Sequence, residues 1–272
     1  MLRAPASAGT AVTMKPFFDV DDWDESLPMM MRIVEQAAED QALGLSSGSW
    51  TCTDNDQALW RSTFDNVGAM LENLNRIAPI LTAMDAGPAP LNRIEFHGTS
   101  DDLKAIQQNM PSFRANDLSI NFFDSGSGFQ AGSVDRKDFE RCRHACSFHP
   151  HFTVKDWAVV EPIMNRILTT TSDEEGCLHL GWTRSGDSLQ WHGDYVNGEA
   201  LKAHFEKVKP LLLELVAGPA TLVRMDVHGP AAELEKSVTL LDNFEPVHFF
   251  KMDERVPSLL DLAPPLPAPQ LT

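Results

Sequence analysis

The sequence predicts an α+β fold in which two ferredoxin-like βαββαβ modules place their sheets face to face within one chain. Two observations support this prediction. The chain repeats one sequence pattern in order, and each copy shows the same succession of strand-like and helix-like segments. A ferredoxin-like sheet carries helices on one face only, so its other face needs a cover, and a second copy of the sheet supplies that cover.

The repeat is visible in short stretches that recur at a nearly constant offset. KPFFDVDDW (Lys15–Trp23) resembles HPHFTVKDW (His149–Trp157), which lies 134 residues further along the chain. AGPAPLNRIEFHG (Ala86–Gly98) matches AGPATLVRMDVHG (Ala217–Gly229) at an offset of 131 residues. Tryptophans between these stretches also correspond, Trp50 with Trp182 and Trp60 with Trp191. Several matches in the same order indicate a tandem duplication.

The repeat sets the expected domain boundaries. The first module spans residues 14–125 and the second spans residues 147–254. The segment 126–146 begins Gly/Ser-rich and continues charged, which is typical of a linker. Residues 255–272 form a Pro-rich tail that we expect to be extended.

Each element of the second module follows from its local pattern. Asp156 can cap a first helix, whose apolar residues recur at helical spacing. Ser185-Gly186-Asp187 separates two strand patterns as a hairpin turn does, and Gly218-Pro219 ends a second helix. Pro210 is a possible kink in that helix. The expected elements are strands 148–154, 177–184, 188–195 and 221–229, a further strand at 247–252, and a helix over 198–218.

Composition excludes several classes of protein. The net charge of −17 argues against binding to nucleic acid or to an anionic membrane surface, both of which depend on clustered Lys and Arg. The sequence contains no apolar run of the roughly 18–20 residues that span a bilayer. Four irregularly spaced cysteines indicate reduced thiols rather than a disulfide framework, so we expect an intracellular protein. An organelle-targeting segment at the N-terminus is an open alternative.

RCRHACSFHPHF (Arg141–Phe152) concentrates Cys and His residues and raises the question of a metal site. One helical turn explains the spacing of Cys142 and Cys146 as well as a ligand pair does, so we interpret the stretch as a linker that enters a strand. His149 and His151 share one face of that strand, opposite its apolar residues. They should therefore point into the space between the two sheets or to its rim.

The second module resembles the antibiotic biosynthesis monooxygenase family of dimeric α+β barrels. The resemblance lies in EEGCLHLGW (Glu174–Trp182), DYVNGEALKAHFE (Asp194–Glu206) and TLVRMDVHG (Thr221–Gly229), and it covers most of residues 150–230. It implies the barrel fold. Members often act as cofactor-independent oxygenases on electron-rich aromatic or quinol-type molecules, whereas others degrade heme, and relatives with the same barrel cyclise polyketides. Because one fold hosts many chemistries, the resemblance leaves the reaction open.

Three residues of the second module are catalytic candidates: His204, Tyr195 and His151. His204 lies beside the apolar stripe of the second helix, and an imidazole there could act as a general base or orient a substrate. Tyr195, the only tyrosine of the chain, could donate a hydrogen bond to a developing oxyanion. Asn73 stands in the slot of His204, so we expect the first module to be degenerate and the second to be functional. The alternatives are a hydrogen-bonded core histidine and a tyrosine that only packs its ring.

Six further residues are candidates for contacting a substrate: His149, His179, Trp182, Trp191, His192 and Asp194. The tryptophans could equally be core anchors. His151, His179 and His192 could hold Zn²⁺ or Fe²⁺ if their registers brought them together. We expect neither a metal nor an organic cofactor, because the histidine registers are unproven and because the sequence has no nucleotide-binding or heme-attachment motif.

These observations predict a cofactor-independent, monooxygenase-like enzyme that acts on a hydrophobic or aromatic small molecule in the second module. One alternative is an acid–base enzyme of the polyketide-cyclase type, in which a His/Tyr pair works without oxygen. Another is a non-catalytic small-molecule-binding or scaffold protein. The expected partner is a small hydrophobic ligand, and because each sheet is covered internally we expect a monomer or a weak homodimer.

Overall fold

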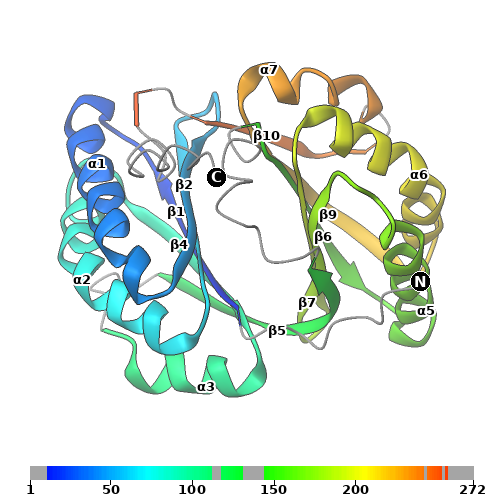
Figure 1. The fold of residues 1–272 in the computed structure, drawn as a ribbon, viewed down its shortest axis with the longest axis horizontal. Helices are drawn as coiled ribbons and strands as arrows, with labels where there is room; N and C mark the ends of the chain where they lie inside the picture. Colours follow the sequence, from blue (N-terminus) through cyan, green and yellow to red (C-terminus); the bar gives the residue numbers. More distant parts are fainter. Residues whose placement is uncertain (1–10, 112–117, 131–143, 242–243, 253–254, 257–272) are drawn as a thin grey trace, which may run out of the picture.

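The computed structural model describes residues 11–111, 118–130, 144–241, 244–252 and 255–256. Its strands form a barrel, and its long helices lie outside that barrel on two opposite sides (Figure 1). The structure is therefore a mixed α+β fold, as the sequence predicts.

The strands of the described chain close into one barrel in the order β1-β3-β2-β10-β9-β6-β8-β7-β5-β4. Their bounds are β1 Val12–Asp19, β2 Leu45–Cys52, β3 Gln57–Phe64, β4 Leu91–Gly98, β5 Ser119–Gln130, β6 Cys146–Val154, β7 Cys177–Ser185, β8 Ser188–Tyr195, β9 Ala220–Gly229 and β10 Val247–Met252. β5 extends five residues into the expected linker, and β6 begins at the end of that linker.

The helices fall between strands at corresponding places in the two halves of the chain. We call β1 to β5 with their helices the first half, and β6 to β10 with theirs the second half. The bounds are α1 Trp23–Asp40, η1 Gln41–Leu43, α2 Val67–Asp85, α3 Ser100–Asn109, α5 Trp157–Thr171, α6 Gly198–Val216, α7 Ala231–Leu234 and η3 Val238–Leu240. Each half therefore begins with the order β-α-β-β-α-β.

The two halves join at both edges of their sheets. β5 pairs with β4 in parallel and crosses to pair with β7 of the second half. β10 pairs with β9 in parallel and crosses to pair with β2 of the first half. These two crossings leave no edge open within the described barrel, which confirms the prediction of one barrel closed within one chain.

The same local signals start the helices in both halves. Asp22 and Asp156 accept a backbone hydrogen bond at the starts of α1 and α5. Asn66 and Asn197 do so at the starts of α2 and α6. A side-chain oxygen at this position satisfies a backbone N–H that the helix itself cannot pair. The capping role expected for Asp156 is therefore confirmed.

Side chains alternate between two environments along every strand. Those on one face pack under the helices in two apolar clusters, one in each half. Those on the other face point into the barrel, where many of the buried side chains are polar or charged. In β8, for example, Trp191 and Tyr195 belong to the helix-side cluster, while His192 contacts Lys15 across the barrel. This period-2 alternation decides which candidate residues can meet.

Some predictions fall outside the described residues. They are the linker at 131–143, which includes Cys142, and the tail from residue 257 onward. Among the described helices, none combines the length and the apolar character that crossing a bilayer requires.

We predict that the protein is monomeric in solution, because the barrel is completed by strands of the same chain. Sedimentation velocity across a range of protein concentrations should show one species with the mass of a single chain. A dimer that persists on dilution would contradict this prediction and would place a second chain on the barrel or on its helices.

Candidate functional site

The structure separates the candidate residues into two groups on opposite faces of the sheet. The helix-side group lies between the sheet and helices α5 and α6, and the other group faces the barrel interior. The helix-side residues are Trp182, Trp191, Tyr195 and His204. The interior residues are His149, His151, His179, His192 and Asp194. A side chain from one group cannot reach a ligand held by the other group, because the sheet lies between them.

His204 is the centre of the helix-side group. It is fully buried under α6, and its Nδ1 lies 2.8 Å from Oε2 of Glu174, in the turn between α5 and β7. The imidazole ring packs 4.7 Å from the Tyr195 ring and 5.4 Å from the Trp191 ring, centroid to centroid. Lys207, one turn further along α6, forms an ion pair with the other oxygen of Glu174 at 3.3 Å. The five side chains thus form one ordered unit.

The contact with Glu174 fixes the tautomer of His204. An ionised carboxylate can only accept a hydrogen bond, so Nδ1 carries the proton and Nε2 keeps its lone pair. Nε2 is buried and has no hydrogen-bond partner among the described residues. Burial lowers the pKa of His204 below its ordinary value, although the hydrogen bond from Nδ1 to Glu174 raises it. At neutral pH the ring is therefore neutral, and Nε2 is an available base.

Tyr195 supplies a proton donor beside that base. Its ring lies over Gly193, where a Cβ atom would come within 2.7 Å of the phenol oxygen. Burial raises the pKa of Tyr195 well above its ordinary value, so the phenol keeps its proton. Cys146 and Cys177 pair with Tyr195 on the two neighbouring strands, and burial raises the pKa of both thiols, for Cys146 to about 12. The thiols are therefore protonated at neutral pH, and the reactive groups here are the imidazole and the phenol.

The first half contains the same unit in a non-basic form. Asn73, in the slot of His204, donates a hydrogen bond of 2.7 Å from Nδ2 to Oδ2 of Asp40. Arg76, in the slot of Lys207, pairs with Asp40 at 2.7 Å. Phe64 replaces Tyr195 at the end of the third strand. An amide and a phenyl ring offer neither a base nor an acidic donor. The first half therefore has the same arrangement of side chains but lacks the groups that proton transfer needs.

The tryptophans differ between the halves in a way that supports the same conclusion. The indole Nε1 of Trp50 donates to the backbone oxygen of Met30 at 3.2 Å. The indole Nε1 of Trp182, the corresponding residue, is buried and finds no acceptor in the described part of the chain. A buried N–H without an acceptor is costly, so the unpaired indole of Trp182 is a difference from Trp50 that a bound ligand would explain. The indole N–H groups of Trp60 and Trp191 are unpaired in both halves and do not distinguish them.

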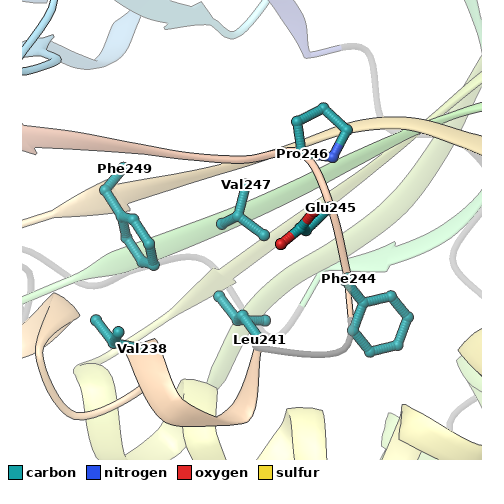
Figure 2. A pocket seen from close by; sticks show the side chains of 7 residues that line it. All are labelled: Val238, Leu241, Phe244, Glu245, Pro246, Val247 and Phe249. Atoms are coloured by element: carbon teal, nitrogen blue, oxygen red, sulfur yellow. The ribbon is translucent and has the colours of Figure 1, made fainter.

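A surface groove of about 530 Å³ adjoins the helix-side layer of the second half (Figure 2). Figure 2 shows Val247 and Phe249 of β10 facing Val238 and Leu241 at η3. Phe244, at one end of the groove, packs 5.5 Å from Phe205, the residue that follows His204 in α6. The first half covers β4 and β5 with α3, which has ten residues, whereas α7 has only four. The shorter α7 explains why the groove lies in the second half.

The interior candidates contact charged partners, some from the first half and some from the second. Arg61 binds Asp194 through two hydrogen bonds of 2.7 and 2.8 Å. His151 lies 3.2 Å from Asp226. Among the described residues, no group of three or more His, Cys, Asp or Glu side chains is arranged to hold a metal ion. The register also places His179 beside Asp194, at 3.8 Å, rather than beside His151.

Sequence reasoning missed several residues of both groups. Glu174 is the most important, because it sets the tautomer of His204. The repeat contains the signal for it: Glu174 follows Asp40 at the same offset of 134 residues that relates His149 to Lys15. Extending the alignment of the two halves through the end of the first helix would have found the acidic residue in both.

Comparison with solved structures identifies the architecture. A protein from Lactobacillus acidophilus NCFM described as a "putative monooxygenase" is 13% identical, with a TM-score of 0.51, over 80% of this chain and 91% of that chain. A protein from Fusobacterium nucleatum with the same description is 12% identical, with a TM-score of 0.53, over 80% and 90%. The chain has the dimeric α+β barrel fold. The resemblance noted in the sequence is therefore confirmed at the level of fold.

A third solved structure matches part of the chain. MupZ from Pseudomonas fluorescens is 26% identical, with a TM-score of 0.37, over 41% of this chain and 92% of that chain. No protein-family model matches the sequence, and no curated protein matches it.

We predict that Tyr195 does not ionise in the folded protein at a pH near the ordinary tyrosine value of about 10. Because Tyr195 is the only tyrosine, the near-ultraviolet absorbance of phenolate reports it alone. The folded protein should show no phenolate signal at that pH, whereas the protein unfolded in urea should titrate with the ordinary midpoint. A folded-state midpoint equal to the unfolded one would show that the phenol is solvated.

Proposed function

We propose that the second half carries an acid–base catalytic site for a hydrophobic small molecule, in which His204 Nε2 removes a proton from the substrate. Glu174 orients the imidazole, and the Tyr195 phenol donates a hydrogen bond to the oxygen on which negative charge develops. The observation that carries this proposal is the Glu174–His204 pair at 2.8 Å, with the buried basic nitrogen left unpaired beside a protonated phenol. A base and a hydrogen-bond donor in one small site are suited to removing a proton from a carbon beside a carbonyl group or from a phenol.

The reaction that we favour is cofactor-independent oxygenation of an aromatic substrate. Anthrone illustrates the balance: removal of one proton gives an electron-rich enolate, which reduces O₂, and the CH₂ group becomes a carbonyl while the second oxygen atom leaves as water. The substrate itself is the reductant, so the reaction requires neither a bound metal nor an organic cofactor. The two proteins of the same fold described as monooxygenases are compatible with this chemistry.

The groove beside α6 is the proposed access route. Its lining is apolar apart from Glu245, and a volume of about 530 Å³ suits a small organic ligand. Phe244 separates the groove from Phe205 and hence from the helix turn that carries His204. A movement of Phe244 would open a path from solvent to the base. We also propose that the side chains of Trp182 and Trp191 line the site and contact the aromatic ring of the substrate.

A non-catalytic binding protein is the second candidate. The observation that favours it is the complete burial of both His204 and Tyr195 in the apolar cluster. A polyketide-cyclase type of reaction would use the same base and donor without oxygen, so it differs from the favoured reaction in substrate rather than in site.

We also infer that the two halves arose by duplication of one ferredoxin-like module, which explains why only one copy keeps a basic residue.

We predict that His204→Ala reduces kcat/KM for anthrone, measured by oxygen uptake, by about 10²–10⁴-fold, the usual contribution of a general base. Tyr195→Phe should reduce it by about 10²-fold or more, because one oxyanion donor is lost. Treatment with EDTA should leave the wild-type rate unchanged.

Asn73→Ala is the matched control, since it removes the corresponding side chain from the first half. It should lower stability by about 1–3 kcal/mol, because the hydrogen bond to buried Asp40 is lost, but should leave the kinetics of anthrone oxidation unchanged. Loss of activity in Asn73→Ala but not in His204→Ala would show that the site assignment is wrong. Binding of anthrone without oxygen uptake would favour the second candidate.

The value of kcat/KM should rise with pH and reach half its maximum below about pH 6.5, the ordinary pKa of histidine. The sign follows because the neutral imidazole is the active form and burial lowers the pKa of His204. An unperturbed histidine, as expected from sequence alone, would place the midpoint at the ordinary value. Glu174→Gln should move the midpoint further down, because the carboxylate that raises the pKa of His204 is removed. A midpoint that does not move in this variant would exclude His204 as the titrating base.

A further inference from the structure

Lys15 occupies the centre of the barrel, on the opposite face of the sheet from the proposed catalytic site. It projects from β1, and its side chain is only 1% exposed. Its Nζ lies 3.2 Å from Nδ1 of His192 and 3.5 Å from Nδ1 of His149. Both histidines belong to the second half, so this lysine joins the two halves through the barrel interior.

The acidic side chains around Lys15 are engaged by other cations. Glu95 lies directly across from Lys15 on β4 but pairs with Arg93 at 3.0 Å and with Arg224 at 3.1 Å. Asp194 is held by Arg61. Within the described residues, no carboxylate lies within ion-pair distance of Lys15 Nζ. An ammonium buried without such a partner is costly to keep charged.

The remaining charged and titratable groups around Lys15 do not change this balance. Burial lowers the pKa of each of the surrounding histidines, to about 3 for His97 and for His228, so these rings are neutral at pH 7. The groups that face Lys15 from the strands around the barrel are Arg61 on β3, Glu95 and His97 on β4, His149 on β6, His179 on β7, His192 and Asp194 on β8, and Asp226 and His228 on β9.

The neutral rings allow Lys15 to be satisfied with or without its extra proton. Nδ1 of His192 accepts from the ammonium, and its Nε2 then donates to Thr183 Oγ1 at 3.0 Å. The Thr183 hydroxyl in turn donates to His97 Nδ1 at 3.1 Å. When Lys15 is neutral, its amine nitrogen can accept a hydrogen bond, and each of these hydrogen bonds can run in the opposite direction. The series of hydrogen bonds from Lys15 through His192 and Thr183 to His97 therefore has two possible directions rather than one.

We propose that Lys15 is a pH-sensitive latch between the two halves of the barrel. Its neutral form is compatible with the histidine-lined interior, and its protonation brings an unpaired charge to the seam and weakens the association of the halves. The proposal concerns the barrel interior and is independent of the proposed catalytic function, because the sheet separates Lys15 from His204.

The direction of the pH effect on stability follows from the shift in the pKa of Lys15. Burial lowers its pKa to about 7, although Glu95 raises it, whereas in the unfolded chain the value is about 10.4. Between these two values the unfolded chain binds more protons than the folded protein, so stability increases with pH in this window. Below about pH 7 the cost of the charged lysine is present in full.

The test compares urea unfolding of the wild type, Lys15→Met and Lys251→Met at several pH values between about 7 and 9. The unfolding equilibrium constant of the wild type, divided by that of Lys15→Met, should fall by up to about tenfold per pH unit, because the contributions of the buried histidines, cysteines and tyrosine are common to both proteins and cancel in the ratio. Lys15→Met should lack this component. Lys251→Met is the matched control, because Lys251 also links the halves through Asp54, with Nζ–O distances of 2.8 Å, but is partly exposed. It should keep the wild-type slope.

A second measurement covers the case in which Lys15→Met does not fold. The ¹³Cε resonance of Lys15 in the labelled wild-type protein should titrate near neutral pH, and the ring resonances of His149 and His192 should change with the same midpoint. A Lys15 midpoint at the ordinary lysine value, or equal stability slopes in the wild type and Lys15→Met, would overturn the proposal.

Discussion

The alternation of side chains along the strands of a closed barrel is the constraint on which the rest of this structure depends. Each strand has one face toward the helices and one toward the interior, and closure leaves no third environment. In β8, Trp191 and Tyr195 join the apolar cluster under α6, while His192 and Asp194 meet charged residues inside the barrel. The two faces therefore develop separate chemistries: a small apolar layer that contains a base and a phenol, and a polar interior that joins the halves.

The polar interior explains how two similar halves form one specific barrel. A symmetric pairing would place equal residues opposite each other, but here the equivalent positions differ: Lys15 meets His149, and Arg61 takes the slot of His192. Arg61 can then bind Asp194 of the other half, and Arg224 can reach back to Glu95. Because a buried charge is tolerated only with a partner, and Asp194 and Glu95 find partners in the other half, these contacts favour this one pairing of the halves. Lys15 departs from the pattern, since its partners are neutral rings.

Much of the fold could be predicted from the sequence, whereas the partners of individual side chains could not. The repeat, the helix cap at Asp156 and the period-2 strand patterns are signals within the sequence, and each element that they predicted is present. The burial of His204 also followed from its helical spacing. Its partner Glu174 lies in a turn, where no periodicity marks a residue as facing inward. The separation of His149 and His192 from His204 depended on the face of each strand, and the metal alternative could be weighed only once the strand registers placed His179 beside Asp194.

The contrast between the halves gives the physical reason for assigning the proposed chemistry to the second one. Both halves keep an acid with a cation beside it, buried Asp40 with Arg76 and partly buried Glu174 with Lys207. In both, the third side chain leaves one polar atom unpaired within the described structure, Oδ1 of Asn73 and Nε2 of His204. An amide oxygen cannot take a proton near neutral pH, but an imidazole nitrogen can, and its carboxylate neighbour stabilises the cation that results. The acid that serves only as a hydrogen-bond acceptor for Asn73 thus becomes, beside His204, part of a proton-transfer unit. A duplicated chain can make this change in one copy because the other copy still completes the barrel.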